Sequence, residues 1–246
     1  SADISGSETF TTGTNVVGTI GAITATVSVV QWDNDGTITW TTNNALNFTV
    51  SGILNNNVGA DFNIVNNGTA NITGGGTFNN KGTMAISGVA ANTNILPAFH
   101  NTGTVNVNAS DLVLDTAGVD TGSYVVASGA LLNFSNNSGT RDLQSGSSVT
   151  GAGDVTFEQA GGTRSIAGTY NITGTTTLSS GTNNFTGSSV TGLGTLNVSG
   201  GTADFSTGND LSLTTMALAS GAIVQGSDNI IITSTLTWTG GDFDGT

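Results

Sequence analysis

A repeat of about 40 residues in the C-terminal half of the chain is the feature that most limits its possible folds. The stretch SSVTGAGDVTFEQAGG (residues 147–162) returns as SSVTGLGTLNVSGG (188–201) and, more weakly, as IIITSTLTWTGG (230–241). Such a period is typical of solenoids, in which each unit buries its apolar side chains only against its neighbours. The fold is therefore expected to be a stack of similar units.

Apolar residues inside this period recur about every six residues, which predicts short strands. The apolar positions are Ile166, Ile172, Leu178, Phe185, Val190 and Leu196. Strands of four or five residues between Gly, Asn or Ser-Gly corners fit the spacing, whereas no segment has the period of a helix. Three strands give a coil of about 20 residues, so the repeat unit is two coils. The sequence predicts an all-β parallel β-solenoid (β-helix), and its winding is expected to be right-handed.

A related pattern in the N-terminal half, an apolar residue followed by Asn-x-Gly-Thr, is interpreted as a corner and the strand after it. It occurs as VNNGTANI (65–72), FNNKGTMAI (78–86) and FHNTGTVNV (99–107). Asn and Gly tolerate the left-handed backbone of a tight corner, while Thr and Val favour strands. Residues 51–246 are therefore assigned to solenoid repeats.

Residues 1–50 differ from these repeats and are predicted to form an N-terminal β cap or separate strand layer over the first coil. Apolar and polar residues alternate over residues 23–29, which predicts a longer strand than any in the repeats. Trp32 and Trp40 then flank the sequence DNDGT.

Charge and composition exclude several classes of partner. Only 8% of the residues are charged, the net charge is −13, and the cations are Lys81, Arg141 and Arg164. Nucleic acids and anionic lipids require a basic surface, so neither is expected as a partner. Membrane insertion is not expected either, because no apolar run approaches the ~18 residues of a membrane span. The chain has no cysteine, which excludes disulfides and thiolate metal sites.

The chain begins at Ser1 without an initiator Met or an apolar leader, as expected of a protein whose signal peptide has been removed. We therefore expect a secreted protein, located extracellularly or at the cell surface.

The phrases FHNTGTVNV, SSVTGLGTLNVSGG and TLTWTGG resemble the right-handed β-helix repeats of large bacterial surface proteins. These include filamentous-haemagglutinin-like adhesins and the passenger domains of autotransporters. The resemblance covers roughly residues 50–246. It implies a role in adhesion, cell-surface architecture or matrix.

Catalytic residues are not expected. Glycoside hydrolysis needs two carboxylates that converge. Asp111 and Asp115 are four residues apart, on the same side of one extended strand, but solvated surface carboxylates are the favoured interpretation. His100 aligns with Asn66 and Asn79 in the repeat pattern, which indicates a turn position and not a general base. The chain is therefore predicted not to be an enzyme.

Calcium is the one cofactor for which the sequence offers candidate ligands. The sequence DNDG offers the carboxylates of Asp33 and Asp35, which are hard oxygen ligands, but an Asx-turn between the two tryptophans is favoured. Thr175 and Thr177 would form one rung of a threonine array of the ice-binding type. The equivalent stretch two coils later reads Thr215, Met216, Ala217, which breaks the pattern.

Two functions are compatible with this sequence. The first is a self-assembling structural subunit, a homo-oligomer that forms filaments by head-to-tail contacts; the alternative is an adhesin or module that binds surface glycans. A glycan site needs several aromatic faces on one exposed stripe, whereas the tryptophans here lie near the two ends of the chain. The predicted assembly interface comprises Trp32, Trp40, Leu236, Trp238 and Phe243.

Overall fold

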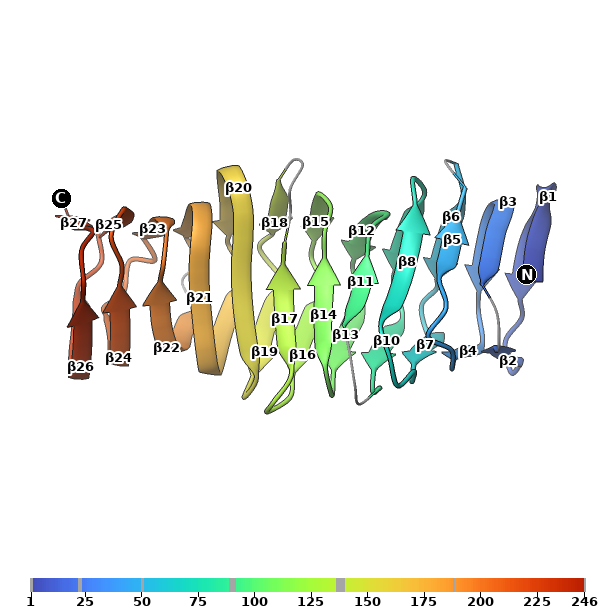
Figure 1. Cartoon of the computed structure of the whole chain (residues 1–246), viewed down its shortest axis with the longest axis horizontal. Helices are drawn as coiled ribbons and strands as arrows, with labels where there is room; N and C mark the ends of the chain where they lie inside the picture. Colours follow the sequence, from blue (N-terminus) through green and yellow to red (C-terminus); the bar gives the residue numbers. More distant parts are fainter. Residues whose placement is uncertain are drawn as a thin grey trace.

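The computed structural model describes residues 2–21, 24–49, 51–88, 92–135, 140–187 and 189–245. These residues form an all-β parallel solenoid of about 11 turns with about 21 residues per turn, and they contain no helix. Figure 1 shows the turns arranged in a row along the long axis, with the two termini at opposite ends. The predicted all-β parallel β-solenoid is therefore confirmed, and its right-handed winding stays a prediction.

Most strands are three to five residues long, and the longest continue through a corner. The described strands are β1 (Ala2–Thr12), β2 (Val17–Ile20), β3 (Ala25–Asn34), β4 (Thr37–Trp40), β5 (Leu46–Phe48), β6 (Ile53–Asn56), β7 (Asp61–Ile64), β8 (Ala70–Gly74), β9 (Thr77–Asn80), β10 (Thr83–Ile86), β11 (Thr93–Ile95), β12 (Ala98–Asn101), β13 (Thr104–Val107), β14 (Asp111–Leu114), β15 (Gly118–Asp120), β16 (Ser123–Val126), β17 (Leu131–Phe134), β18 (Arg141–Leu143), β19 (Ser148–Gly151), β20 (Asp154–Ile166), β21 (Thr169–Phe185), β22 (Val190–Val198), β23 (Gly201–Phe205), β24 (Leu211–Leu218), β25 (Ala222–Gly226), β26 (Ile230–Trp238) and β27 (Asp242–Gly245).

Three parallel sheets run the length of the stack. The first sheet passes through β5, β8, β11, β14 and β17, the second through β6, β9 and β12 and then β15 and β18, and the third through β4, β7, β10, β13, β16 and β19. The longer strands contribute to more than one sheet: β1, β3 and β26 each contribute to two, and β21 contributes to all three. Each coil therefore contributes one strand segment to each sheet.

The register confirms that the 40-residue repeat equals two coils. Val149 pairs with Tyr170, and Tyr170 pairs with Val190 one coil further on. Val149 and Val190, the valines of the two SSVTG sequences, thus lie two coils apart in one column.

Side chains alternate between the core and the surface along each short strand. In β9 and β12 the pattern is intermediate, buried, intermediate, buried. Phe78 and Phe99 occupy equivalent inward positions, with ring centroids 5.3 Å apart in an edge-to-face arrangement. Stacked apolar columns of this kind form one continuous core, because each coil is covered only by the coils before and after it.

The left-handed backbone predicted for the asparagines of the Asn-x-Gly-Thr pattern is wrong, because none of them has a positive φ. Asn66 and Asn67 do lie at a corner, between β7 and β8. Asn79 and Asn80 lie within strand β9 and not in a left-handed turn. The glycine is required for a different reason: a Cβ atom on Gly82 would collide with the carbonyl oxygens of Asn57 and Ala60 in the preceding coil. Close approach of successive coils, and not positive φ, selects glycine at this corner.

Strand pairing shows no break at residue 50, where the sequence predicted a boundary between a cap and the repeats. Strand β1 pairs in parallel with β3, and β3 pairs with β5 and β6 in the same way. The predicted strand is β3, although residues 22 and 23 lie outside the described part of the chain. The prediction that it is longer than any strand of the repeats is wrong, because β3 has 10 residues and β20 and β21 have 13 and 17. The segment 2–48 thus contributes strands to the same three sheets as the repeats that follow.

Candidate functional site

A ladder of buried asparagines runs along one corner of the solenoid. The amides of Asn34, Asn56, Asn80 and Asn101 are stacked one per coil, and each Nδ2 donates to the Oδ1 of the next at 2.8–2.9 Å. The same Nδ2 atoms also donate to a backbone carbonyl at the start of a third-sheet strand, at 2.9–3.1 Å. All four side chains are fully buried. The ladder satisfies polar atoms that would otherwise be costly to bury.

The ladder ends on a buried ion pair. Asp120 accepts a hydrogen bond from the backbone N–H of Asn101 at 2.8 Å and one from Nη1 of Arg141 at 2.7 Å. Within the described residues no paired positions join β12 to β15, and the guanidinium lies at this break. Its Nη2 donates to the carbonyl of Phe99 at 3.0 Å and its Nε to that of Thr116 at 3.2 Å. Arg141 therefore replaces missing sheet hydrogen bonds.

A second buried arginine follows one coil later. Arg164 donates to the backbone carbonyls of Arg141 and Phe134 and to Oδ1 of Asn183, each at 3.2 Å. Its guanidinium also lies 5.0 Å from the ring centroid of Phe157, a cation–π distance. Burial, together with the nearby charge of Arg141, lowers the pKa of Arg164 to about 9.

This polar column was not anticipated from the sequence. The signal was the recurrence of adjacent asparagines at Asn55–Asn56 and Asn79–Asn80, one coil apart. One member of each pair faces outward and the other inward, which the sequence does not distinguish. Because both arginines are buried in this column, Lys81 is the only exposed Lys or Arg side chain in the described chain, and the surface is almost free of positive charge.

The carboxylates of Asp33 and Asp35 bind neighbouring amides. Asp33 accepts hydrogen bonds from Nε2 of Gln31 at 2.8–2.9 Å and from Nδ2 of Asn55 at 2.7 Å. Asp35 accepts one from Nδ2 of Asn57 at 2.8 Å. No group of three or more His, Cys, Asp or Glu side chains suited to a metal occurs within the described residues.

The candidate catalytic residues lie on the outer face of strands or at their ends. Asp111 begins β14, and Asp115 directly follows it. His100 lies within β12 and pairs with Asn79, as predicted, but the next member of its column is Asn55 and not Asn66. It occupies an outward strand position, which corrects the interpretation as a turn.

Threonines form a longer column than the sequence suggested. Thr175, Thr195, Thr215 and Thr235 pair in register on the first sheet. The column two residues further on reads Thr177, Asn197, Ala217, Thr237. A complete Thr-x-Thr rung thus occurs in only two of these four coils.

The last coil presents inward-column residues to solvent. Leu236, Trp238 and Phe243 are 43%, 58% and 41% exposed, whereas their partners one coil earlier are buried. Trp238 and Phe243 pack edge to face with centroids 5.4 Å apart, and the indole Nε1 donates to the carbonyl of Gly241 at 3.1 Å. The C-terminal end of the solenoid rod, which we call the tail, therefore exposes an aromatic pair beside unpaired strand edges.

The first coil carries an apolar hollow of about 270 Å³. Gly18 stands in this coil where the next two coils place Ile38 and Phe62, so no side chain fills the inward position. The side chain of Ile38 in the next coil reaches toward this position, because a Cβ on Gly18 would lie only 2.7 Å from Cδ1 of Ile38. Ile4 and Phe10 form further parts of the wall, and Phe10 is exposed.

The predicted interface is corrected for two of its five residues. Trp32 and Trp40 are only 2% and 1% exposed, because β1 and β2 of the first coil cover them on one side and the following coil covers them on the other. Nε1 of Trp32 donates to Oγ1 of Thr12 at 3.0 Å inside the stack. Phe10 precedes Trp32 in the same column. It is the aromatic residue exposed at the N-terminal end of the rod, the coil of β1 and β2, which we call the head.

These features define the chain as a parallel β-solenoid with a buried polar corner and open apolar ends. Comparison with known protein families, curated proteins and solved structures finds no match. Within its described residues the chain contains no helix with the length and apolar character needed to cross a membrane.

Proposed function

We propose that this chain is a secreted, non-enzymatic structural protein, a subunit that assembles head to tail into a cell-surface filament or matrix. The observation that best supports this proposal is that the two ends of the rod are complementary: the first coil has an apolar hollow, and the last coil has an exposed aromatic pair. Trp238 and Phe243 of one copy would enter the hollow beside Phe10 of the next. The resemblance of the repeats to those of bacterial surface proteins supports the same location.

Strand edges at the two ends are also compatible with continued pairing. The head presents β1 in the first and second sheets and β2 in the third, and the tail presents β26 and β27 in the same three sheets. Unpaired edges of this kind are templates for another chain. A second copy in the same orientation would continue every sheet, which is the heterologous contact that generates filaments.

Charge predicts how such an assembly depends on salt. The head exposes Asp3 and Glu8, and the tail exposes Asp242 and Asp244. These carboxylates repel one another when two copies meet. Salt screens this repulsion, so the association should strengthen as the ionic strength rises from about 0.01 to 0.15 M.

The exposed aromatic residues favour assembly over glycan binding. Of the aromatic side chains, all of which belong to the described residues, only Phe10, Trp238 and Phe243 are exposed, and all three lie on the end coils. The sides of the rod lack the aromatic stripe on which sugar rings stack.

Light scattering of the purified chain at increasing concentration and 0.15 M salt tests the proposal. The expected result is a mass that rises above the 24.4 kDa of one copy, together with slower acrylamide quenching of Trp238, the only exposed tryptophan. Trp238→Lys should abolish both changes. Val125→Lys, at a 42% exposed position on the side of the rod, is the matched control and should assemble normally.

A chain that stays monomeric at every concentration and salt would overturn the proposal. The adhesin or glycan-binding module would then be the favoured function. Assembly that survives Trp238→Lys but is lost in Val125→Lys would place the contact on the side of the rod and would also contradict it.

A further inference from the structure

The third sheet is interrupted at one step of the described chain. In this sheet each strand is paired with the next in the order β2, β4, β7, β10, β13, β16, β19, β21 and β22. Beyond the interruption, β24 is paired with β26. Between β22 and β24 the pairing begins only at Thr195 and Thr215, which belong to the first sheet. The segments Val190–Leu193 and Leu211–Leu213 thus each pair on one side only.

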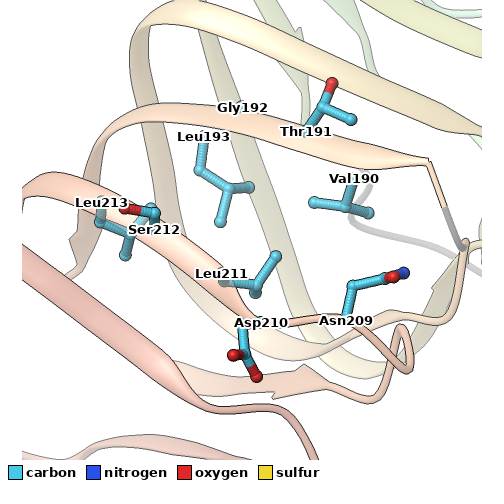
Figure 2. A pocket seen from close by; sticks show the side chains of 9 residues that line it. All are labelled: Val190, Thr191, Gly192, Leu193, Asn209, Asp210, Leu211, Ser212 and Leu213. Carbon is cyan, nitrogen blue, oxygen red and sulfur yellow. The ribbon is translucent and has the colours of Figure 1, made fainter.

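A cavity of about 320 Å³ lies at this interruption. Figure 2 shows the side chains of Val190 and Leu193 on one strand and Leu211 on the next directed into the space between the strands. The rim carries polar side chains, including the carboxylate of Asp210, and no cation. The site is therefore an apolar slot between two strand edges, and its rim bears a negative charge.

The other interruption of a sheet shows what such a gap requires. Between β12 and β15 the guanidinium of Arg141 lies in the break and donates to the carbonyl of Phe99. The residues that line the gap between Val190–Leu193 and Leu211–Leu213 include no arginine or lysine. One break is filled by the protein itself, and the other is hollow.

We propose that this slot binds an extended peptide segment by β-strand addition. A peptide backbone supplies alternating N–H and C=O groups that can pair with the unpaired strand edges, which a sugar or a lipid does not. Alternate small apolar side chains of the peptide would face Val190, Leu193 and Leu211. A lysine or arginine at its end would complement Asp210 and the acidic surface of the chain, whose net charge is −13.

The proposal is tested with a fluorescein-labelled probe, acetyl-Lys-Val-Ser-Val-Ser-Val-Lys-amide, in an anisotropy titration against the 246-residue chain. Saturable binding with a Kd below about 1 mM is expected. A probe with proline in place of the central valine lacks one N–H group and should bind at least tenfold more weakly. A probe with glutamate in place of both lysines should also bind more weakly, because Asp210 then repels it.

Leu211→Trp tests the position of the site, because the larger side chain fills the slot (Figure 2). It should weaken the lysine probe at least tenfold while the far-UV circular dichroism and the melting temperature stay near wild type. Val125→Trp, which adds an indole on the outside of the same sheet, is the control and should bind normally. If Leu211→Trp does not fold, Asp210→Lys takes its place and should reverse the preference between the lysine and glutamate probes.

The proposal is overturned if the wild-type chain gives no saturable change, if the proline probe binds as well as its parent, or if a folded Leu211→Trp variant binds like wild type. Assembly of the rod does not enter these outcomes, because Trp238→Lys should bind the probe normally.

Discussion

Asp120 and Arg141 form a salt bridge of 2.7 Å between side chains that are both 0% exposed. The pair lies where the asparagine ladder ends and where the second sheet lacks paired strands. Its neighbours supply the remaining partners, because Asp120 accepts from the backbone of Asn101 and Arg141 donates to that of Phe99. A buried pair of this kind becomes a liability as soon as one partner is removed.

Asp120→Asn should therefore lower the free energy of unfolding by about 3–5 kcal/mol, because it leaves the guanidinium of Arg141 charged and buried without a counterion. Urea unfolding followed by circular dichroism measures the change. Asp3→Asn removes an exposed carboxylate and should change stability by less than about 0.5 kcal/mol. Equal effects of the two substitutions would show that the pair does not hold the corner together.

The asparagine ladder makes a prediction that two adjacent, identical residues can test. Asn80→Ala removes the hydrogen bonds to Asn101 and to the carbonyl of Thr104 and leaves buried groups unpaired, so it should cost at least about 2 kcal/mol. Asn79→Ala changes the outward neighbour, whose bond to Asn55 is only partly buried, and should cost less than about 1 kcal/mol. Urea unfolding compares them, and a larger loss for Asn79→Ala would reverse the assignment of the inward face.

The two tyrosines should resist ionisation at alkaline pH. Burial raises the pKa of both Tyr124 and Tyr170 above the ordinary value of 10.0, and the charge of Asp120 adds to the effect at Tyr124. Above pH 10 the unfolded chain loses these protons while the folded chain keeps them. Each tyrosine therefore stabilises the fold below pH 10 relative to higher pH, and this contribution falls by about 1.4 kcal/mol per pH unit as the pH rises further.

Absorbance at 295 nm, which reports tyrosinate, should stay flat through pH 10 and rise in one step that coincides with unfolding by circular dichroism. The lowered pKa of Arg164 acts in the opposite direction above about pH 9. Tyr170→Phe isolates the tyrosine contribution, because the variant should lose less stability with rising pH than wild type. A gradual absorbance rise centred on pH 10 in the folded chain would contradict the prediction.

The periodicity of the sequence predicted much of the fold of this chain. The spacing of Val149 and Val190 indicated two coils of three strands, and the register places Tyr170 between them. This works because stacking repeats the same local environment in every coil, so an apolar column appears as a period in the sequence. The exposed positions of Leu236, Trp238 and Phe243 also lie on that periodic pattern.

The direction of polar side chains was decided only by the tertiary structure. Asn79 and Asn80 are chemically identical, and the coils above and below determine which of them is buried. Arg141 and Arg164 look like surface cations in the sequence, but stacked carbonyls, Asp120 and aromatic rings provide partners for them inside. The sequence position of Trp32 predicted that it lies at an end, yet β1 covers it on one side and the following coil on the other. Periodicity records apolar burial, whereas the burial of a polar group depends on partners that lie one coil or more away along the chain.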